Sequence, residues 1–385
     1  MTAFTFRTAP RIISQIGGLA QLASLCADLG ITRPLIVTDP GIVGCGIAAR
    51  AMTVLNQGGL SPALFDKVAA DPPVAMVEAA VAFARQSQAD GIIGLGGGSS
   101  LDTAKVVALL TRSTQGITEI FGTDMAIGGR LPLIQVPTTA GTGSEVTWVS
   151  VVTNEAHEKK AVYTPQLLPD IALLDAELTV GMPAKVTAAT ALDAMVHAIE
   201  GFTSRTRKNP MADCFAQKGL ALLATHLPRV LANGGDLESR AAMLEGSMLG
   251  GMAFVNASVA AIHALAYPLG ARFHVPHGHS NAIVMGPVLR FNLPAAESLY
   301  AQLAPCLLPG QSFATPAAAA EAFVTAMEAM AGWGGLETRL SALGVTADDI
   351  PSMAEEVVTQ IQRLIATNPR PMSHADVCEL YRQVL

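Results

Sequence analysis

The sequence predicts an α/β fold with a parallel sheet, followed by an all-helical domain. Three short apolar runs support the sheet, because each ends in turn residues and helical patterns lie between them. Strand-like runs that alternate with helical segments are typical of parallel sheets. The runs lie at 34–39, 91–95 and 131–136, and the clearest helical patterns at 74–88 and 101–110.

The sequence changes in character near Gly181-Met182-Pro183. Beyond this point, strand-like runs give way to long segments rich in alanine, leucine and methionine, which favour helices. A chain of 385 residues is also long for a single hydrophobic core. We therefore expect two domains: an α/β domain over 1–181 and a helical domain over 182–385.

The composition is that of a compact globular protein. Half of the residues are apolar, only 14% are charged, and the net charge is -7. A negative chain without a basic run disfavours nucleic-acid binding. The low charge content suggests that some surface is buried in an oligomer, and we expect a homodimer.

Several features favour a cytoplasmic location without membrane association. The five cysteines are scattered, odd in number and without a CxxC pair, as expected in a reducing compartment. The amino-terminal residues lack the long apolar core of a signal peptide. The most apolar stretch, 250–270, contains Asn256, Ser258 and His263, so we expect a buried helix there and not a membrane span.

A glycine-rich turn, GGGSSLD from Gly96 to Asp102, follows the second predicted strand and opens a helix. Glycines allow a pyrophosphate to approach the backbone closely, and a helix N-terminus offers N–H donors and partial positive charge. Ser99 adds a hydroxyl donor, and Asp102 favours the start of the helix. An ordinary glycine turn with a capping serine is the alternative, and the motif is not the GxGxxG fingerprint.

Two other strand ends carry polar residues. Asp39 ends the first predicted strand, where a carboxylate could accept from an adenosine ribose hydroxyl; an aspartate in the turn before Pro40-Gly41 explains it equally well. The loop PTTAGTGSEVT, from Pro137 to Thr147, is rich in hydroxyls and could line a polar cofactor, or could be a solvated turn.

Four side chains suited to metal binding lie in apolar sequence: Asp193, His197, His263 and His277. The first two are four residues apart, so on a helix they share one face and can bind one ion, or pair with each other. One carboxylate with three imidazoles suits a divalent transition metal. His274 and His279 flank the last of the four and are alternative ligands.

These motifs resemble those of the iron-containing, or group III, alcohol dehydrogenases, which have the dehydroquinate synthase-like fold. The resemblance runs nearly end to end and rests on GGGSSLDTAK, PTTAGTGSEVT, TALDAMVHAIEG and HALAYPLGARFHVPHGHSNA. It implies metal ligands at Asp193, His197, His263 and His277, with Fe²⁺ as the ion; Zn²⁺ would also suit them. It implies NAD contacts at Asp39, Gly97, Gly98, Ser99, Asp102, Thr138, Thr139, Thr142, Thr147, Val151, Lys159 and Leu178.

The chain departs from the family pattern beside the expected metal. Many members carry a histidine four residues after the third ligand, close to the substrate; here Tyr267 takes that position. It shares a helix face with His263, so its phenol can reach the site, as a weaker acid than imidazolium. We therefore expect Tyr267 and His277 to be the catalytic residues.

The resemblance implies an NAD-dependent enzyme that transfers hydride between a metal-bound alcohol and NAD. The substrate would be a small alcohol or aldehyde. Two alternatives have the same fold: an enzyme like maleylacetate reductase, and a metal-dependent lyase like dehydroquinate synthase. The lyase would need more basic residues around the site for a phosphorylated substrate.

Overall fold

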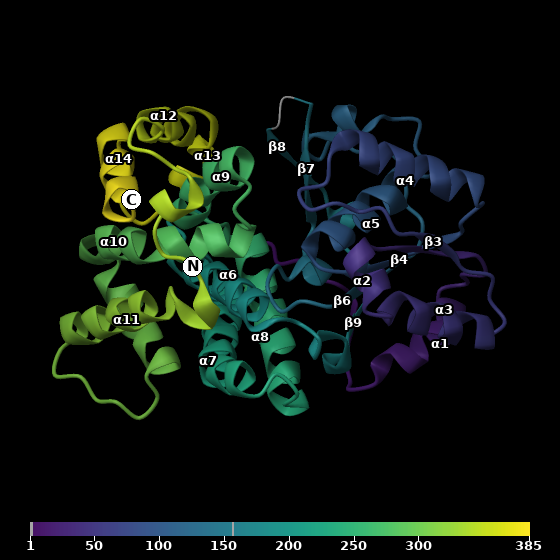
Figure 1. Ribbon diagram of the computed structural model, residues 1–385, viewed down its shortest axis with the longest axis horizontal. Coiled ribbons are helices and arrows are strands. Elements are labelled where there is room, and N and C mark those ends of the chain that lie inside the picture. The colour runs from purple at the N-terminus through teal and green to yellow at the C-terminus, as the bar shows by residue number, and fades with distance from the viewer. Residues whose placement is uncertain (1–2, 156–157) are drawn as a thin grey trace. The chain divides into compact units, whose positions relative to one another are not determined.

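The computed structural model describes residues 3–155 and 158–385. The chain forms two compact units (Figure 1). One is continuous, from Arg7 to Gly181. The other contains everything from Met182 to Leu385 together with the amino-terminal segment that ends at Phe6. Within this second unit, the ring of Phe6 packs 5.4 Å from that of Phe215. The boundary predicted from the sequence places residues 1–181 in one domain, whereas the structure assigns the segment that ends at Phe6 to the second unit.

The first unit contains a six-stranded parallel sheet, which confirms the predicted fold class. The strands follow the order β1 (Arg11–Ser14), β9 (Ile171–Leu174), β6 (Leu133–Pro137), β4 (Gly91–Gly96), β2 (Pro34–Val37) and β3 (Ala63–Phe65). The central strands are entirely buried, as expected for a parallel sheet with both faces covered. The three runs recognised in the sequence are these central strands.

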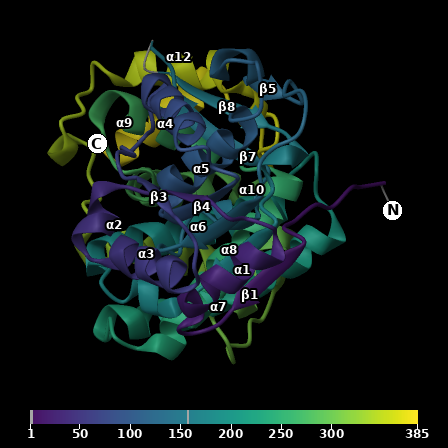
Figure 2. The same cartoon turned by 90° about the vertical axis from the view of Figure 1, so that its right-hand side faces the viewer.

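Helices cover both faces of the sheet, as Figures 1 and 2 show. Leu35 and Ile92 belong to a core formed with α4 (Val74–Gln86) and α5 (Gly98–Leu110). Their neighbours Ile36 and Ile93 belong to the opposite core, formed with α1 (Leu22–Asp28) and α3 (Ile47–Gln57). The alternation follows from the two-residue period of a strand. The unit is completed by α2 (Pro40–Gly44) and by a small sheet of β5 (Gly122–Thr123), β8 (Lys159–Tyr163) and β7 (Val149–Thr153).

The second unit is helical, as the alanine- and leucine-rich sequence predicts. Its helix α6 (Ala184–Thr203) is buried along nearly all its length and packs against α7, α8 and α10. The remaining helices are α7 (Pro210–Ala232), α8 (Leu237–Ala257), α9 (Ala261–Phe273), α10 (His277–Leu307), α11 (Pro316–Met330), α12 (Ile350–Gln360), α13 (Gln362–Ile365) and α14 (His374–Gln383).

The expectation of one helix over 250–270 is wrong. The chain breaks between α8 and α9, whose axes differ by 105°. Ser258 has a φ of 97°, in the left-handed region that a helix cannot continue through. Within residues 3–155 and 158–385, no single helix is long and apolar enough to cross a membrane, and only this bent pair meets the length and composition criteria together.

Candidate metal centre and cofactor site

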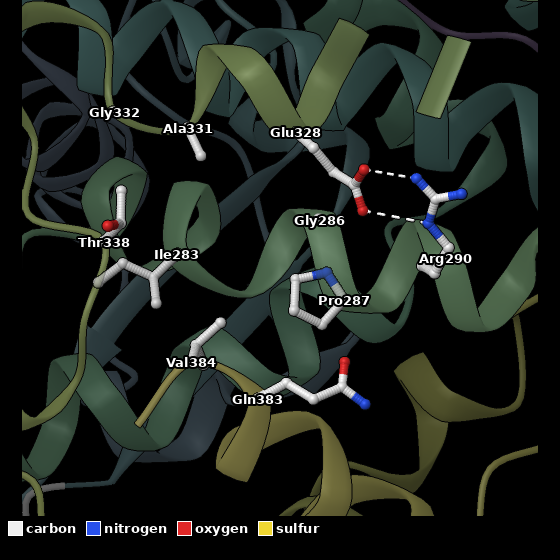
Figure 3. A pocket seen from close by; sticks show the side chains of 10 residues that line it. All are labelled: Ile283, Gly286, Pro287, Arg290, Glu328, Ala331, Gly332, Thr338, Gln383 and Val384. Carbon is white, nitrogen blue, oxygen red and sulfur yellow. Dashed lines mark hydrogen bonds and ion pairs between the residues drawn. The ribbon is translucent and has the colours of Figure 1, made fainter. Parts of the chain in front are cut away.

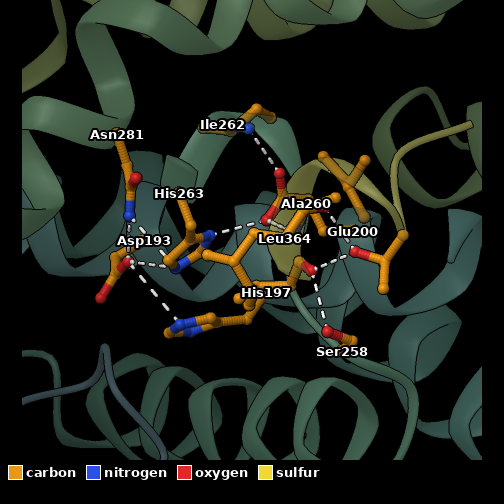
Figure 4. Close-up of polar contacts among 12 residues, drawn as sticks. Asp193, His197, Glu200, Ser258, Ala260, Ile262, His263, Asn281 and Leu364 are labelled. Atoms are coloured by element: carbon orange, nitrogen blue, oxygen red, sulfur yellow. Dashed lines mark hydrogen bonds and ion pairs between the residues drawn. The ribbon is translucent and has the colours of Figure 1, made fainter. Parts of the chain in front are cut away.

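Three helices of the second unit bring four potential ligands together, and Figure 4 shows three of them, Asp193, His197 and His263. Helix α6 contributes Asp193 and His197, one turn apart on a buried face. His263 lies in the first turn of α9, and His277 is the first residue of α10. One ligand atom from each residue lies within 4.8 Å of those of the other three. Among the described residues, this is the one group of His, Cys, Asp or Glu arranged to hold a metal ion.

The geometry fits a metal ion. Oδ1 of Asp193 lies 3.8 Å from Nε2 of His197, 3.6 Å from Nε2 of His263 and 3.5 Å from Nε2 of His277. At metal–ligand distances of about 2.1 Å, tetrahedral ligand atoms lie about 3.4 Å apart. The three distances from Asp193 are therefore close to those that an ion would impose, and ordinary ion pairs would be shorter.

The cluster is buried except on one side. The side chains of Asp193 and His263 are 3% and 2% exposed, whereas that of His277 is 31% exposed. Burial alone raises the pKa of Asp193, but the imidazoles of His197 and His277 hold it well below its usual range. Burial lowers the pKa of His263, but the carboxylates of Glu200 and Asp193 raise it to about 9. The carboxylates of Asp193 and Glu200 thus favour positive charge within the cluster.

Two glycines allow the helices to approach closely enough for this arrangement. A Cβ on Gly278, in the first turn of α10, would lie 2.3 Å from the carbonyl oxygen of Ala189 on α6. A Cβ on Gly250 of α8 would lie 2.9 Å from the carbonyl oxygen of Ala194. A side chain on Gly278 would force α10, and His277 with it, away from α6, and one on Gly250 would force α8 away from α6.

The alternative histidines lie outside the cluster. His274 ends α9 in the left-handed conformation, with a φ of 54°. His279 is buried, and its Nε2 bonds to the backbone carbonyl of Glu337 at 2.7 Å. Among the described residues, neither belongs to a group that could hold an ion.

Two neighbours of the cluster were not singled out from the sequence. Glu200 on α6 accepts a hydrogen bond from Nδ1 of His263 at 2.7 Å. The amide nitrogen of Asn281, one turn after His277 on α10, donates to Oδ1 of Asp193 at 2.7 Å. Both could have been found by helical spacing, because Glu200 lies seven residues after Asp193 and Asn281 four after His277.

Tyr267 lies on the partly exposed side of the cluster. Its ring centroid is 6.0 Å from that of His277, with the planes 41° apart. The residue is half-buried on α9, one turn after His263. A phenol in this position borders the one accessible ligand, as its spacing in the sequence suggests.

The glycine-rich turn lies in the first unit, between β4 and α5. Helix α5 starts at Gly98 without a side-chain cap, and the first N–H groups of such a helix can bind an anion. A Cβ on Gly98 would lie 2.6 Å from Cγ2 of Thr142 in the hydroxyl-rich loop. The two motifs therefore pack directly together, and the residues present fit a pyrophosphate.

Asp102 organises this part of the unit. Its Oδ1 accepts from the Ser144 hydroxyl at 2.6 Å, and its Oδ2 accepts from the backbone N–H of Val151 at 2.9 Å. Lys105, fully buried one turn later on α5, donates to the Thr147 hydroxyl at 2.9 Å. The aspartate thus ties the helix to the hydroxyl-rich loop and to β7, a role that the sequence did not suggest.

The remaining expected cofactor residues differ in their surroundings. Thr138 is buried, whereas Ser99, Thr139 and Thr142 are partly exposed beside the turn. Lys159 on β8 forms an ion pair with Asp71 at 2.8 Å. Leu178 is buried in the core beneath the sheet, where it packs with the helices α1 and α3.

Glu145, in the same loop, was also missed. It is buried, and burial raises its pKa from 4.5 to about 7, against the opposing pull of Lys105. A glutamate inside a loop of small and hydroxylated residues looks solvent-exposed in sequence, so only the structure reveals its burial.

The helical unit also contains a cavity away from the metal cluster (Figure 3). Its volume is about 390 Å³. Residues of α10, the end of α11 and the carboxyl terminus line it, among them Gly286, Pro287, Gln383 and an ion pair between Arg290 and Glu328. None of the four clustered ligands lines this cavity.

The α/β unit carries a glycine-rich turn suited to phosphate groups, and the helical unit carries an Asp-His₃ cluster. These two features together are those of a metal-dependent dehydrogenase. The family model for iron-containing alcohol dehydrogenases matches residues 9–176, and that for their C-terminal region matches 187–385. The chain belongs to the iron-containing alcohol dehydrogenase family.

Known relatives agree with this assignment. The chain is 37% identical to long-chain-alcohol dehydrogenase 1 of Geobacillus thermodenitrificans, covering 95% of this chain and 92% of that protein. It is 31% identical to the NAD-dependent methanol dehydrogenase of Bacillus methanolicus, covering 99% of each. The crystal structure of a 1,3-propanediol oxidoreductase superposes with a TM-score of 0.95 at 31% identity, covering both chains completely. These matches favour an alcohol dehydrogenase over both alternatives considered from the sequence.

Proposed function

We propose that this enzyme interconverts a primary alcohol and its aldehyde, with NAD as the redox cofactor and Fe²⁺ at the Asp-His₃ cluster. The observation that carries the proposal is that Asp193, His197, His263 and His277 each place one ligand atom within 4.8 Å of the others. Zn²⁺ would also suit these ligands. The substrate class follows relatives named for methanol, long-chain alcohols and 1,3-propanediol.

When bound, the ion would supply Lewis acidity for an alcohol oxygen, and NAD would accept a hydride. The protein's part is to hold and orient these groups. Asp193, His197 and His263 would fix the ion from the buried side, and His277 from the accessible side. Tyr267 borders that side, and its hydroxyl would hydrogen-bond the substrate.

In the first unit, Gly97, Gly98 and Ser99 would bind the pyrophosphate through the start of α5. Asp39 would accept from the adenosine ribose. Asp102 would act indirectly, because its carboxylate is engaged with Ser144 and Val151. The other proposed contacts are Thr138, Thr139, Thr142, Thr147, Val151, Lys159 and Leu178.

We also propose that the functional division follows the sequence, with cofactor binding over 1–181 and metal and substrate binding over 182–385. A cytoplasmic homodimer fits the low charge content and the five free thiols at Cys26, Cys45, Cys214, Cys306 and Cys378. Light scattering coupled to size exclusion would test the oligomeric state.

The test of the activity is an anaerobic assay of purified protein loaded with Fe²⁺ or Zn²⁺. NADH absorbance would be followed with primary alcohols in one direction and aldehydes in the other, with chelator-treated protein as the control. Turnover that depends on both metal and NAD supports the proposal. Conversion of a substrate with no net change in NADH would instead favour a lyase of the dehydroquinate synthase type.

A further inference from the structure

Glu200 is the most heavily engaged carboxylate beside the metal cluster. It is 3% exposed and lies on α6, one turn after His197. Its Oε2 accepts from Nδ1 of His263 and from the backbone N–H of Ala260, both at 2.7 Å. Its Oε1 accepts from the N–H of Ile262, also at 2.7 Å. Figure 4 shows these contacts, which surround the carboxylate with three donors.

Two of these donors belong to the start of α9. The residue at the N-cap position of this helix is Ala260, which has no side-chain acceptor, so the helix lacks a cap of its own. Glu200 supplies the acceptor from another helix, directly after the sharp turn at Ser258. A negative charge is also favourable at a helix N-terminus.

The third donor belongs to a potential ligand. A neutral imidazole carries one N–H, and an acceptor at Nδ1 places that hydrogen there. Nε2 then keeps its lone pair, and this atom lies 3.6 Å from Oδ1 of Asp193. The same carboxylate therefore fixes both the tautomer of His263 and the helix turn that carries it.

We propose that Glu200 is a positioning residue of the metal centre, which holds His263 in the orientation and tautomer that bind the ion. The inference rests on the proposed function, because it concerns the ion that the cluster would hold. Replacement of a carboxylate that fixes a ligand histidine in this way commonly lowers metal affinity by about 10- to 100-fold.

If Glu200 only stabilised the fold, loss of another buried helix cap would lower metal affinity equally. A matched control variant therefore distinguishes a positioning role from a structural one. Asn209 is also buried, lies in the same unit and caps α7 by accepting from the N–H of Ala212 at 2.9 Å. It contacts none of the four potential ligands. Asn209→Ala thus removes a buried cap of comparable kind while leaving the cluster intact.

The experiment measures Zn²⁺ affinity by chelator competition on the full-length, metal-free protein, together with its thermal unfolding. Glu200→Gln should weaken Zn²⁺ binding about 10- to 100-fold. Asn209→Ala should lower the unfolding temperature but change affinity less than about twofold. Glu200→Asp, which keeps the charge but shortens the side chain, should lie between wild type and Glu200→Gln, and it carries the test if the latter does not fold.

The outcomes distinguish this inference from the proposed function. Wild-type protein that binds neither Zn²⁺ nor Fe²⁺ would overturn both. If wild type binds and both Glu200 variants bind equally well, only the positioning role is overturned. An equal loss of affinity in Asn209→Ala would likewise overturn it, because the effect would then follow from general destabilisation.

Discussion

The hydroxyl of Ser100 donates to Oδ2 of Asp39 at 3.0 Å and so joins the first turn of α5 to the end of β2. The other carboxylate oxygen of Asp39 accepts from the N–H groups of Gly41 and Ile42, at 2.9 and 3.1 Å, and caps α2. The turn role that the sequence suggested is therefore real. A ribose contact is compatible with it, because a carboxylate oxygen can accept more than one hydrogen bond.

Because the carboxylate of Asp39 also caps α2, the substitution that tests cofactor choice must preserve this cap. Asp39→Gly would remove the cap together with the charge, whereas Asp39→Asn keeps an equally good cap and removes only the charge. We expect Asp39→Asn to reduce the preference for NAD over NADP by about 1–3 kcal/mol, because a carboxylate beside a 2′-phosphate is repulsive. Kinetics with both cofactors would measure it. A wild-type enzyme that prefers NADP would refute the role given to Asp39.

Removal of a single imidazole should abolish metal binding. We expect His263→Ala and His277→Ala to lose the bound ion and to reduce turnover by more than about 100-fold, the upper end for residues that only support a ligand. NAD binding should persist, since the glycine-rich turn belongs to the other unit. Elemental analysis and NADH fluorescence would measure the two properties.

His226→Ala provides the control for these variants. His226 lies on α7 in the same unit and bonds the Ser239 hydroxyl at 3.0 Å, outside the cluster. It should retain both metal and activity. Full metal content and turnover in either ligand variant would contradict the assignment.

Tyr267→Phe tests the departure from the family pattern. A phenol with a pKa of about 10 relays protons poorly near neutral pH, so we expect Tyr267 to shape the substrate site through hydrogen bonding. The variant should then raise KM more than it lowers kcat and leave the shape of the pH profile unchanged. A fall in kcat of about 100-fold with the loss of one limb of the profile would instead identify Tyr267 as an acid–base group.

Glu145 should make stability depend on pH. Burial raises its pKa from 4.5 to about 7, so the folded state favours the protonated carboxyl. The resulting stabilisation is fully present below pH 4.5 and is lost as the pH rises through 7. Glu145→Gln stays neutral throughout, so its free energy of unfolding relative to wild type should rise by about 3 kcal/mol across this window.

Denaturant unfolding of both proteins at a series of pH values would measure the difference. Effects of other titrating groups are shared by the two proteins and largely cancel in the comparison. A difference that stays constant between pH 4.5 and 7 would show that the Glu145 carboxyl keeps its ordinary pKa in the folded state.

Strong local patterns made much of the architecture predictable. The buried strands β4 and β6 are short, largely apolar runs that end in glycine or proline. The break at Ser258 was not predictable, because no glycine or proline lies between Met252 and Tyr267. A long-range contact, from Glu200 to the start of α9, supports it instead.

The metal cluster and the cofactor site differ in the same way, because one pair of ligands in the first rests on local spacing and the organisation of the second on long-range contacts. The spacing of Asp193 and His197 on one helix is local, so their shared face was visible in the sequence. The part played by Asp102 depends on Ser144 and Val151, more than forty residues away in the chain. A lone acidic residue in a helical turn gives no sign of such distant partners, so its role as an organiser appears only in three dimensions.

The return of the amino-terminal segment to the helical unit has a consequence for synthesis. All residues of the α/β unit, from Arg7 to Gly181, are translated before the first helix of the other unit, so this unit can fold while translation continues. The helical unit cannot be completed in this way, because Phe6 is translated first and its partner Phe215 much later. Phe6 therefore cannot contact Phe215 until translation has passed through the whole α/β unit.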